Sequence, residues 1–253
     1  MMKPWPKAGS RRLKKRLRIL ITCGPTREPL DPVRYLSNFS TGEMGFSLAR
    51  EASRLGHKVT LLHGPVMVPA DLSVRKRSFA TTQELKGLLK GELKKHDILF
   101  MAAAVSDFRP SVRRFSKIKR QDRKHNGRPL TLRLVPNPDV LSSIARFRRH
   151  CVLVGFSVES RDLYRNALRK LREKSLDMIV GQNVGRGFSP FGDTLIDALI
   201  LHREGAPIVL RRTSKRTLSR FLLKKALELW ECRHRVIFSG NGGCEEKGDC
   251  HLR

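Results

Sequence analysis

One short stretch decides which kind of sheet this chain can build. Residues 19–22 form an apolar, β-branched run that ends at Gly24-Pro25, which predicts a buried strand stopped by a turn. After Gly45, apolar residues recur at helical spacing until Gly56, and residues 59–62 predict a second strand. The order strand, helix, strand is typical of a βαβ unit. The expected fold class is therefore α/β, a Rossmann-like, doubly wound and mainly parallel sheet.

The connection between the first strand and its helix departs from the usual dinucleotide-binding pattern. That pattern is a tight turn with G-x-G-x-x-G, whereas here a loop of residues 26–41 precedes Gly42 and Gly45. The loop contains apolar residues that a solvated linker does not need, so we expect it to fold over the site rather than to be a disordered insertion. These residues are Leu30, Val33, Tyr35, Leu36 and Phe39. Ser40, Thr41 and Gly42 would place a hydroxyl cap and free N–H groups at the helix N-terminus, which favours an anion.

The remaining chain alternates between apolar strands and amphipathic helices. We expect strands at 74–82, 98–105, 152–156 and 177–184, and helices at 83–95, from 138 onward, and at 161–174. From Gly185 the pattern changes to two strands joined at residues 203–206, an antiparallel hairpin, followed by a helix at 214–233. The hairpin would lie at an edge of the sheet, and pairing with a second copy of the chain is one way to cover such an edge.

The charge of the chain is unusual. Lys and Arg number 52 against 23 Asp and Glu, a formal net charge of +29. We expect a basic, disordered arm at 1–17, a single domain at 18–235 and a disordered tail at 236–253. No apolar run approaches the ~20 residues of a membrane-spanning helix, and the five irregularly spaced cysteines fit a reducing compartment, so we expect a cytoplasmic protein.

Four blocks of sequence resemble one known family. The longest is "GPTREPLDPVRYLSNFSTGEMG" at 24–45, followed by "AAAVSDFR" at 102–109, "KIKR" at 117–120 and "PNPDVL" at 136–141. They resemble phosphopantothenoylcysteine synthetase, also called phosphopantothenate-cysteine ligase, of the coenzyme A pathway. Only residues 1–17 precede the first expected strand. The resemblance therefore implies a stand-alone ligase without the flavin-dependent decarboxylase domain that many bacterial members carry.

The resemblance implies a reaction and its partners. The ligase would condense 4'-phosphopantothenate with L-cysteine through an acyl-nucleotide, with Mg²⁺ and a nucleoside triphosphate. The blocks look bacterial, which favours CTP over ATP. Family members are dimers, so a homodimer is expected, and a separate phosphopantothenoylcysteine decarboxylase is a further expected partner.

The resemblance also implies roles for individual residues. Asn38 would hold the carboxylate and then the acyl carbonyl, and Lys117 would be the lysine of a mobile flap whose family pattern K-x-K-K ends here in Arg120. The nucleotide would be surrounded by Met101, Ala102, Ala103, Asp107, Pro138, Asp139, Val140, Leu141, Phe156, Lys170 and Lys174. Weaker candidates for substrate contacts are Arg34, Ser40, Thr41, Gly42 and Ala104. No metal ligand is assigned, because the phosphates often supply most of the ligands in such sites.

Two other functions, and another interpretation of one segment, fit parts of the sequence. A nicotinamide oxidoreductase fits the fold class, but it needs a tight glycine turn and an acid at the end of the second strand, where this chain has Leu62-His63-Gly64. A nucleic-acid-binding protein fits the charge, but no zinc finger, basic zipper or aromatic RNA-binding signature is present, so no specific nucleic acid is expected. Composition alone would make the basic segment at 110–128 a solvated surface rather than a flap.

Overall fold

The structure is a computed structural model that describes residues 15–119, 129–145, 147–148, 150–185, 189–203 and 205–239. The tail beyond residue 239 and all but the last three residues of the expected arm lie outside this range, as does Arg120 of the expected flap. In the described part of the chain, no helix combines the length and apolarity needed to cross a bilayer.

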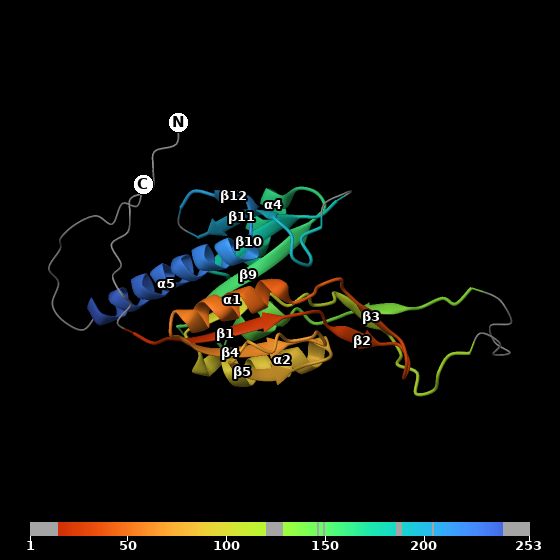
Figure 1. Ribbon diagram of the computed structural model, residues 1–253. Coiled ribbons are helices and arrows are strands. Elements are labelled where there is room, and N and C mark those ends of the chain that lie inside the picture. Colours follow the sequence, from red (N-terminus) through yellow and green to blue (C-terminus); the bar gives the residue numbers. More distant parts are fainter. Residues whose placement is uncertain are drawn as a thin grey trace.

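An eight-stranded sheet forms the centre of the described residues (Figure 1). Its order is β12-β11-β10-β9-β6-β1-β4-β5. The strands are β1 (Arg18–Cys23), β4 (Lys58–His63), β5 (Arg75–Ser78), β6 (Ile98–Met101), β9 (Val152–Glu159), β10 (Met178–Asn183), β11 (Ile196–His202) and β12 (Ile208–Thr213). The pairs from β5 through β10 are all parallel, which confirms the expected Rossmann-like α/β fold.

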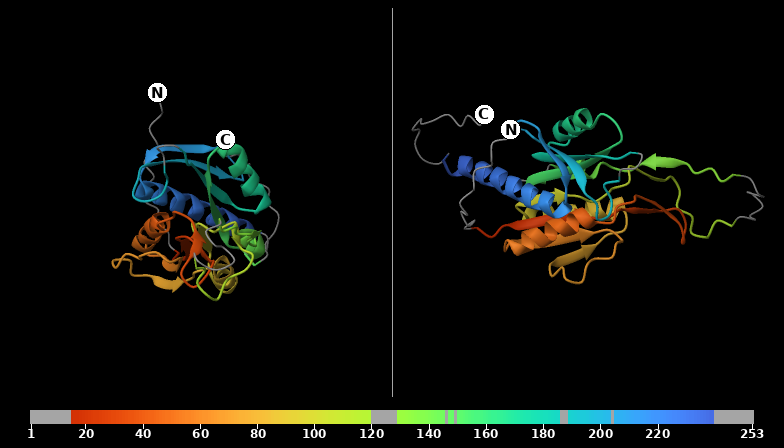
Figure 2. Two further views of the ribbon diagram at one scale, coloured as in Figure 1. Left: turned by 90° about the vertical axis from the view of Figure 1, so that its right-hand side faces the viewer. Right: turned by 45° about the horizontal axis from the view of Figure 1, so that its top comes forward.

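Helices cover both faces of the sheet (Figure 2). One face packs on α1 (Glu43–Arg54) and α5 (Lys215–Ser239). The other packs on α2 (Thr82–Glu92), its short extension η1 (Leu93–Lys95), α3 (Val140–Ala145) and α4 (Leu163–Glu173). The alternation of strand side chains explains the two cores: Ile19 and Ile21 lie in the first, and Leu20 between them lies in the second.

The chain changes direction across the sheet between β1 and β6. From β1 it moves outward to β4 and β5, and it then returns to β6 on the other side of β1 and continues to β9 and β10. In open α/β sheets the carboxyl ends of the strands at such a switch point form the crevice that binds ligands. The ends of β1 and β6 are therefore where a site is expected.

The predicted hairpin is confirmed as β11 and β12. β11 is antiparallel to both β10 and β12, so β12 runs parallel to β10 again. Because of these two reversals, α5 begins at the edge of the sheet where the parallel strands end. The last helix thus contributes its first residues to the crevice.

The long loop after β1 is folded rather than extended. It contains a two-stranded ribbon of β2 (Arg27–Pro29) and β3 (Tyr35–Ser37), and a second ribbon of β7 (Phe108–Pro110) and β8 (Leu134–Pro136) follows β6. Both ribbons lie beyond the carboxyl end of the sheet (Figure 1). Backbone hydrogen bonds from Thr26 N to Ala104 O (3.1 Å) and from Ala104 N to Gly24 O (2.9 Å) join the starts of the two connections.

The strand expected at 98–105 ends earlier, at Met101. The reason is a side chain: the N–H of Ala103 donates to the Thr22 hydroxyl at 3.0 Å instead of to a neighbouring strand. Similarly, the helix expected from Pro138 begins at Val140. Residues 102–104 are therefore loop, with their small side chains at the edge of the sheet.

Gly45 allows α1 to lie directly on β1, and we expect Gly45→Ala to destabilise the fold. A Cβ at position 45 would lie 2.3 Å from the Cys23 Cβ, which requires the helix or the strand to shift. We expect a loss of roughly 1–3 kcal/mol in the free energy of unfolding, the usual effect of overpacking. Denaturant unfolding measures it.

The matched control for that variant is Gly87→Ala in α2, where an added Cβ meets no atom within 4 Å. Alanine there should raise stability by up to ~1 kcal/mol through helix propensity. If both variants lowered the denaturation midpoint equally, the close contact between α1 and β1 would not be the cause.

Candidate functional site

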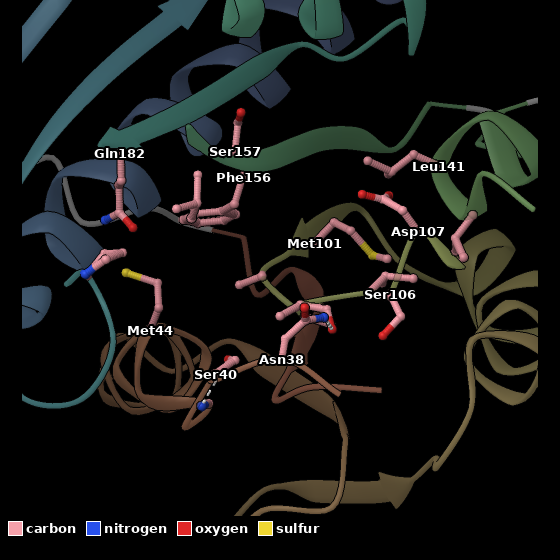
Figure 3. Close-up of a pocket in the computed structure, with 18 of the residues that line it drawn as sticks. Asn38, Ser40, Met44, Met101, Ser106, Asp107, Leu141, Phe156, Ser157 and Gln182 are labelled. Carbon is pink, nitrogen blue, oxygen red and sulfur yellow. Dashed lines mark hydrogen bonds between the residues drawn. The ribbon is translucent and has the colours of Figure 1, made fainter. Parts of the chain in front are cut away.

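A pocket of about 420 Å³ opens at the carboxyl ends of the parallel strands (Figure 3). The loop before α1 forms one wall and the loop after β6 forms another. The ends of β9 and β10, Lys170 in the last turn of α4, Lys174 at its C-cap and the first residue of α5 complete it. Its two ends are well separated: Asp107 and Leu141 lie at one, and Gln182 and Met44 lie at the other, with Phe156 and Asn38 between them (Figure 3).

The pocket gathers the site residues named from the sequence, except Arg34 and Lys117. The residues that line it are Asn38, Ser40, Thr41, Gly42, Met101, Ala102, Ala103, Ala104, Asp107, Pro138, Asp139, Val140, Leu141, Phe156, Lys170 and Lys174. These residues come from five separate stretches of the chain. The fold therefore brings these residues together around one pocket.

Arg34 and Lys117 lie outside the pocket. The Arg34 guanidinium is paired with the Asp31 carboxylate, and it also donates to the Ile118 carbonyl at 2.9 Å. The Ile118 N–H in turn donates to Asp31 at 3.2 Å. These hydrogen bonds hold the pKa of Asp31 well below its usual value, and the bond from Arg34 has the largest effect. In this state, Arg34 ties the exposed start of the basic segment, including Lys117, to the first loop.

Asn38 is held at the centre of the pocket by one hydrogen bond. Its Nδ2 donates to the carbonyl of Ala104 at 2.9 Å, so the loop before α1 is joined to the loop after β6. An amide has a second N–H and a carbonyl oxygen. With the residue itself exposed, these groups can meet a ligand.

The start of α1 differs in detail from the expected hydroxyl cap. Gly42 is the N-cap, with φ 84°, and no side chain caps the helix. The Ser40 hydroxyl instead accepts from the Gly42 N–H at 3.4 Å. Glycine is the residue that adopts this left-handed conformation at low cost, which explains why the hydroxyl residues precede the cap. Gly42, Glu43 and Met44 line the pocket, and the N–H groups of a first helical turn have no partner within the helix.

Side-chain hydrogen bonds fix the loops that shape the pocket. The Thr26 hydroxyl accepts from Ser106 N at 3.0 Å, and Asn137 Nδ2 donates to Ser106 O at 2.9 Å. Below them, the buried Glu28 carboxylate accepts from the Thr82 hydroxyl at 2.7 Å and from its N–H at 3.0 Å. This network links the connections after β1, β5, β6 and β8. The pocket is therefore largely preformed.

Both α4 lysines in the pocket have carboxylate partners. Lys170 Nζ lies 2.7 Å from Glu159 and Lys174 Nζ lies 3.2 Å from Asp139. Burial raises the pKa of both carboxyls, but hydrogen bonds and the lysine charges outweigh it, so each pKa lies below its usual value. Each ammonium retains donors for a ligand, since it has three N–H groups.

Several residues that line the pocket were not predicted from the sequence. They are Glu43, Met44, Val105, Ser106, Asn137, Ser157, Val158, Leu176, Ile179, Gln182, Pro190, Phe191, Gly192 and Lys215. Gln182 stands at the carboxyl end of a parallel strand, so the rule that ligands bind there could have found it. Lys215 gives no such signal, because its place depends on the two reversals through β11 and β12.

The described residues offer no ready metal centre. No group of three or more His, Cys, Asp or Glu side chains among them is placed to hold a metal ion. Cys23 and Cys151 are buried, and burial raises the pKa of both thiols, which makes them unreactive. A magnesium ion in this pocket would depend on phosphate oxygens for most of its ligands.

The fold and the pocket define a Rossmann-like α/β domain with a pocket at its topological switch point. The particular family follows from comparison with known sequences: the chain belongs to the DNA/pantothenate metabolism flavoprotein C-terminal domain family, whose model matches residues 14–229.

Proteins of known name support this membership. The coenzyme A biosynthesis bifunctional protein CoaBC of Escherichia coli K12 is 36% identical over 222 residues, which are 87% of this chain and 54% of the relative. The CoaBC protein of Vibrio vulnificus CMCP6 is 37% identical over 211 residues, 82% of this chain and 51% of the relative. The chain thus spans about half the length of these relatives. A crystal structure of a CoaBC C-terminal domain matches 88% of this chain and 100% of its own, with a TM-score of 0.71 and 29% identity.

Proposed function

We propose that this protein is a phosphopantothenate-cysteine ligase that condenses 4'-phosphopantothenate with L-cysteine at the expense of a nucleoside triphosphate. The observation that carries the proposal is that Asn38, the small residues after β6 and the two α4 lysines line one preformed pocket. Membership of the family and the CoaBC relatives, which are named for coenzyme A biosynthesis, support it. A nicotinamide oxidoreductase is disfavoured, because β4 ends at His63 where such domains carry an acid.

The first step is activation of the carboxylate. One carboxylate oxygen of phosphopantothenate attacks the α-phosphorus, the bond from that phosphorus to the bridging oxygen breaks, and pyrophosphate leaves. Lys170 and Lys174 lie where they can bind the triphosphate, and Met101 to Ala103, Asp107, Pro138 to Leu141 and Phe156 would surround the nucleoside. The free N–H groups at the start of α1 suit an anionic group.

The second step forms the amide. The cysteine nitrogen attacks the acyl carbonyl and loses a proton, and the carbon–oxygen bond to the nucleotide breaks to release the nucleoside monophosphate. Negative charge develops on the carbonyl oxygen in this step. The second N–H of Asn38 can donate to that oxygen while the first remains on Ala104 O.

Lys117 is proposed to act from the segment beside the pocket. Lys117 does not line the pocket, and its neighbour Ile118 is hydrogen-bonded to Asp31 and Arg34 of the first loop. The proposed role therefore requires the segment that bears Lys117 to move toward the pocket. A lysine brought to the α-phosphate would neutralise charge during phosphoryl transfer.

The remaining parts of the proposal concern partners. We propose CTP as the preferred nucleotide, Mg²⁺ as the metal, a cytoplasmic location, a homodimer and a separate decarboxylase that consumes the product. The free edge of β12, where Val209 is exposed, is one surface for a second copy. Phe39 and Phe115, which are 89% and 92% exposed, are two further apolar side chains that a second copy could cover.

Pyrophosphate release tests the proposed function. The protein is incubated with phosphopantothenate, cysteine and Mg²⁺, and with CTP or ATP in turn. The proposal expects release that depends on phosphopantothenate and is faster with CTP. Absence of release with every nucleotide would exclude the ligase function, and faster release with ATP would correct only the nucleotide.

A further inference from the structure

One end of the pocket holds two side chains, Gln182 and Lys215, to which the proposed mechanism gives no role. The nucleoside is assigned to the end with Asp107 and Leu141, and the acyl group is assigned to Asn38 near the centre. The other end contains Gln182 and Met44 (Figure 3). Lys215 and Gly192 also line the pocket, and their contact places them together.

Gln182 has a hydrogen-bond donor that nothing described satisfies. The residue is 7% exposed, and its Nε2 is buried without a partner among the described residues. Leaving such a donor unpaired in the interior destabilises the protein. Its amide points into the pocket, toward the same space as the Met44 side chain (Figure 3). A ligand with an acceptor oxygen would satisfy it.

Lys215 places a buried positive charge in the same pocket. It is 5% exposed, and its Nζ donates to the carbonyl of Gly192, which leaves N–H donors for another acceptor. No ion pair of the described residues includes it, although Glu43 and Asp193 are near enough to act on its charge. Burial lowers the pKa of Lys215, and these two carboxylates raise it in part. A buried ammonium of this kind is stabilised by an anionic ligand.

The fold explains why these two donors meet. Gln182 is near the carboxyl end of β10, and Lys215 is the first residue of α5. The chain leaves β10, passes through β11 and β12, and starts α5 at the same edge of the sheet. The charge and the amide therefore come from two elements that the antiparallel hairpin brings together.

We propose that Lys215 and Gln182 bind the α-carboxylate of the amino-acid substrate. This inference rests on the proposed function and adds a binding site for its second substrate. An anionic oxygen group at this place could also be the end of the triphosphate, but Glu43 lines the same pocket and Asp193 lies close to Lys215. Two carboxylates near one ammonium repel a multiply charged phosphate, whereas they suit a zwitterion with one carboxylate and one ammonium.

The proposed site requires a carboxylate on the substrate. Cysteine presents a carboxylate to Lys215 and Gln182, and cysteamine, which has the same amine and thiol, presents none. The wild-type protein should therefore prefer cysteine. The preference should depend on the two donors and not on nucleotide binding.

The test compares Lys215→Met and Gln182→Met with the wild-type protein. Methionine is as long as glutamine and one atom shorter than lysine, and both changes remove the donors of the side chain. We expect the KM for cysteine to rise at least about tenfold in Lys215→Met, the scale of a lost charge-assisted hydrogen bond, and less in Gln182→Met. The rate at saturating cysteine, the activity with cysteamine and the Kd of CTP measured by calorimetry should stay within about twofold of wild type.

Lys225→Met is the matched control, since Lys225 lies further along α5 and pairs with Glu228 at 2.9 Å. It should leave every one of these constants unchanged. If Lys215→Met weakens CTP binding and leaves the KM for cysteine unchanged, the site binds phosphate and the assignment is wrong. If it changes neither, Lys215 is structural and the inference also fails.

The inference and the proposed function fail in different ways. If the wild-type protein ligates nothing, the proposed function is excluded, and calorimetry with L-cysteine and cysteamine then decides on the site alone. Binding of L-cysteine that is lost in Lys215→Met would support the site. Equal binding of both amines, or no binding of either, would overturn it.

Discussion

Asn38→Asp should lower kcat by about 10²–10³, or about 2.7–4 kcal/mol of barrier, the scale measured for removal of one oxyanion donor. The substitution changes little in size, but it replaces the donor that bonds to Ala104 O at 2.9 Å with an acceptor. The carboxylate would face a backbone carbonyl and would repel the substrate carboxylate. It would also lack the N–H proposed to stabilise the acyl carbonyl. Steady-state kinetics of ligation measures the effect.

Asn183→Asp separates this effect from a general change in charge. Asn183 is exposed at the end of β10, does not line the pocket, and gives the same change in net charge. It should keep kcat close to that of wild type. Full turnover in Asn38→Asp would refute the role given to Asn38, and equal losses in both variants would mean that overall charge is responsible.

Lys117→Gln should lower kcat at least about tenfold, equivalent to ~1.4 kcal/mol, with little change in stability. Lys117 is exposed, and its neighbour Ile118 is bonded to Asp31 and Arg34, so loss of one surface charge should not disturb the fold. A solvated surface lysine would have almost no effect on turnover. A lysine that meets charge developing at the α-phosphate acts in the transition state and is seen in kcat.

Lys124→Gln is the control for that variant, because it removes the same charge beyond the "KIKR" motif. It should be nearly silent. If both substitutions reduced kcat to the same extent, positive charge in general would be needed rather than a placed lysine. If neither did, Lys117 would have no part in catalysis.

The sheet could be predicted because the apolar pattern that indicates a strand lies within the residues of that strand. The apolar runs at 19–22 and 98–101 are continuous, as in strands buried on both faces, and Gly24 and Gly56 mark the ends of the first strand and the first helix. The predicted end of a strand was wrong where a side chain replaced a backbone hydrogen-bond partner. The N–H of Ala103, for example, donates to the Thr22 hydroxyl. Such a contact joins residues far apart in sequence, and no local pattern reports it.

The pocket could be predicted only in part, for a similar reason. Asn38 and residues 101–104 were found because their blocks resemble a family and because they follow strands. Arg34 was expected at the substrate, but its guanidinium is bonded to Asp31 and Ile118 in this state. Lys215 was missed because helical periodicity places its helix but not the edge of the sheet at which that helix begins.

Detection of the ligation product tests the central claim most directly. The wild-type protein is incubated with 4'-phosphopantothenate, L-cysteine, Mg²⁺ and CTP, and the products are identified by mass spectrometry, with omission of each component as the control. The account predicts phosphopantothenoylcysteine together with equal amounts of CMP and pyrophosphate, and no product when any component is omitted. Hydrolysis of CTP to CDP and phosphate, or no amide product with either CTP or ATP, would contradict it.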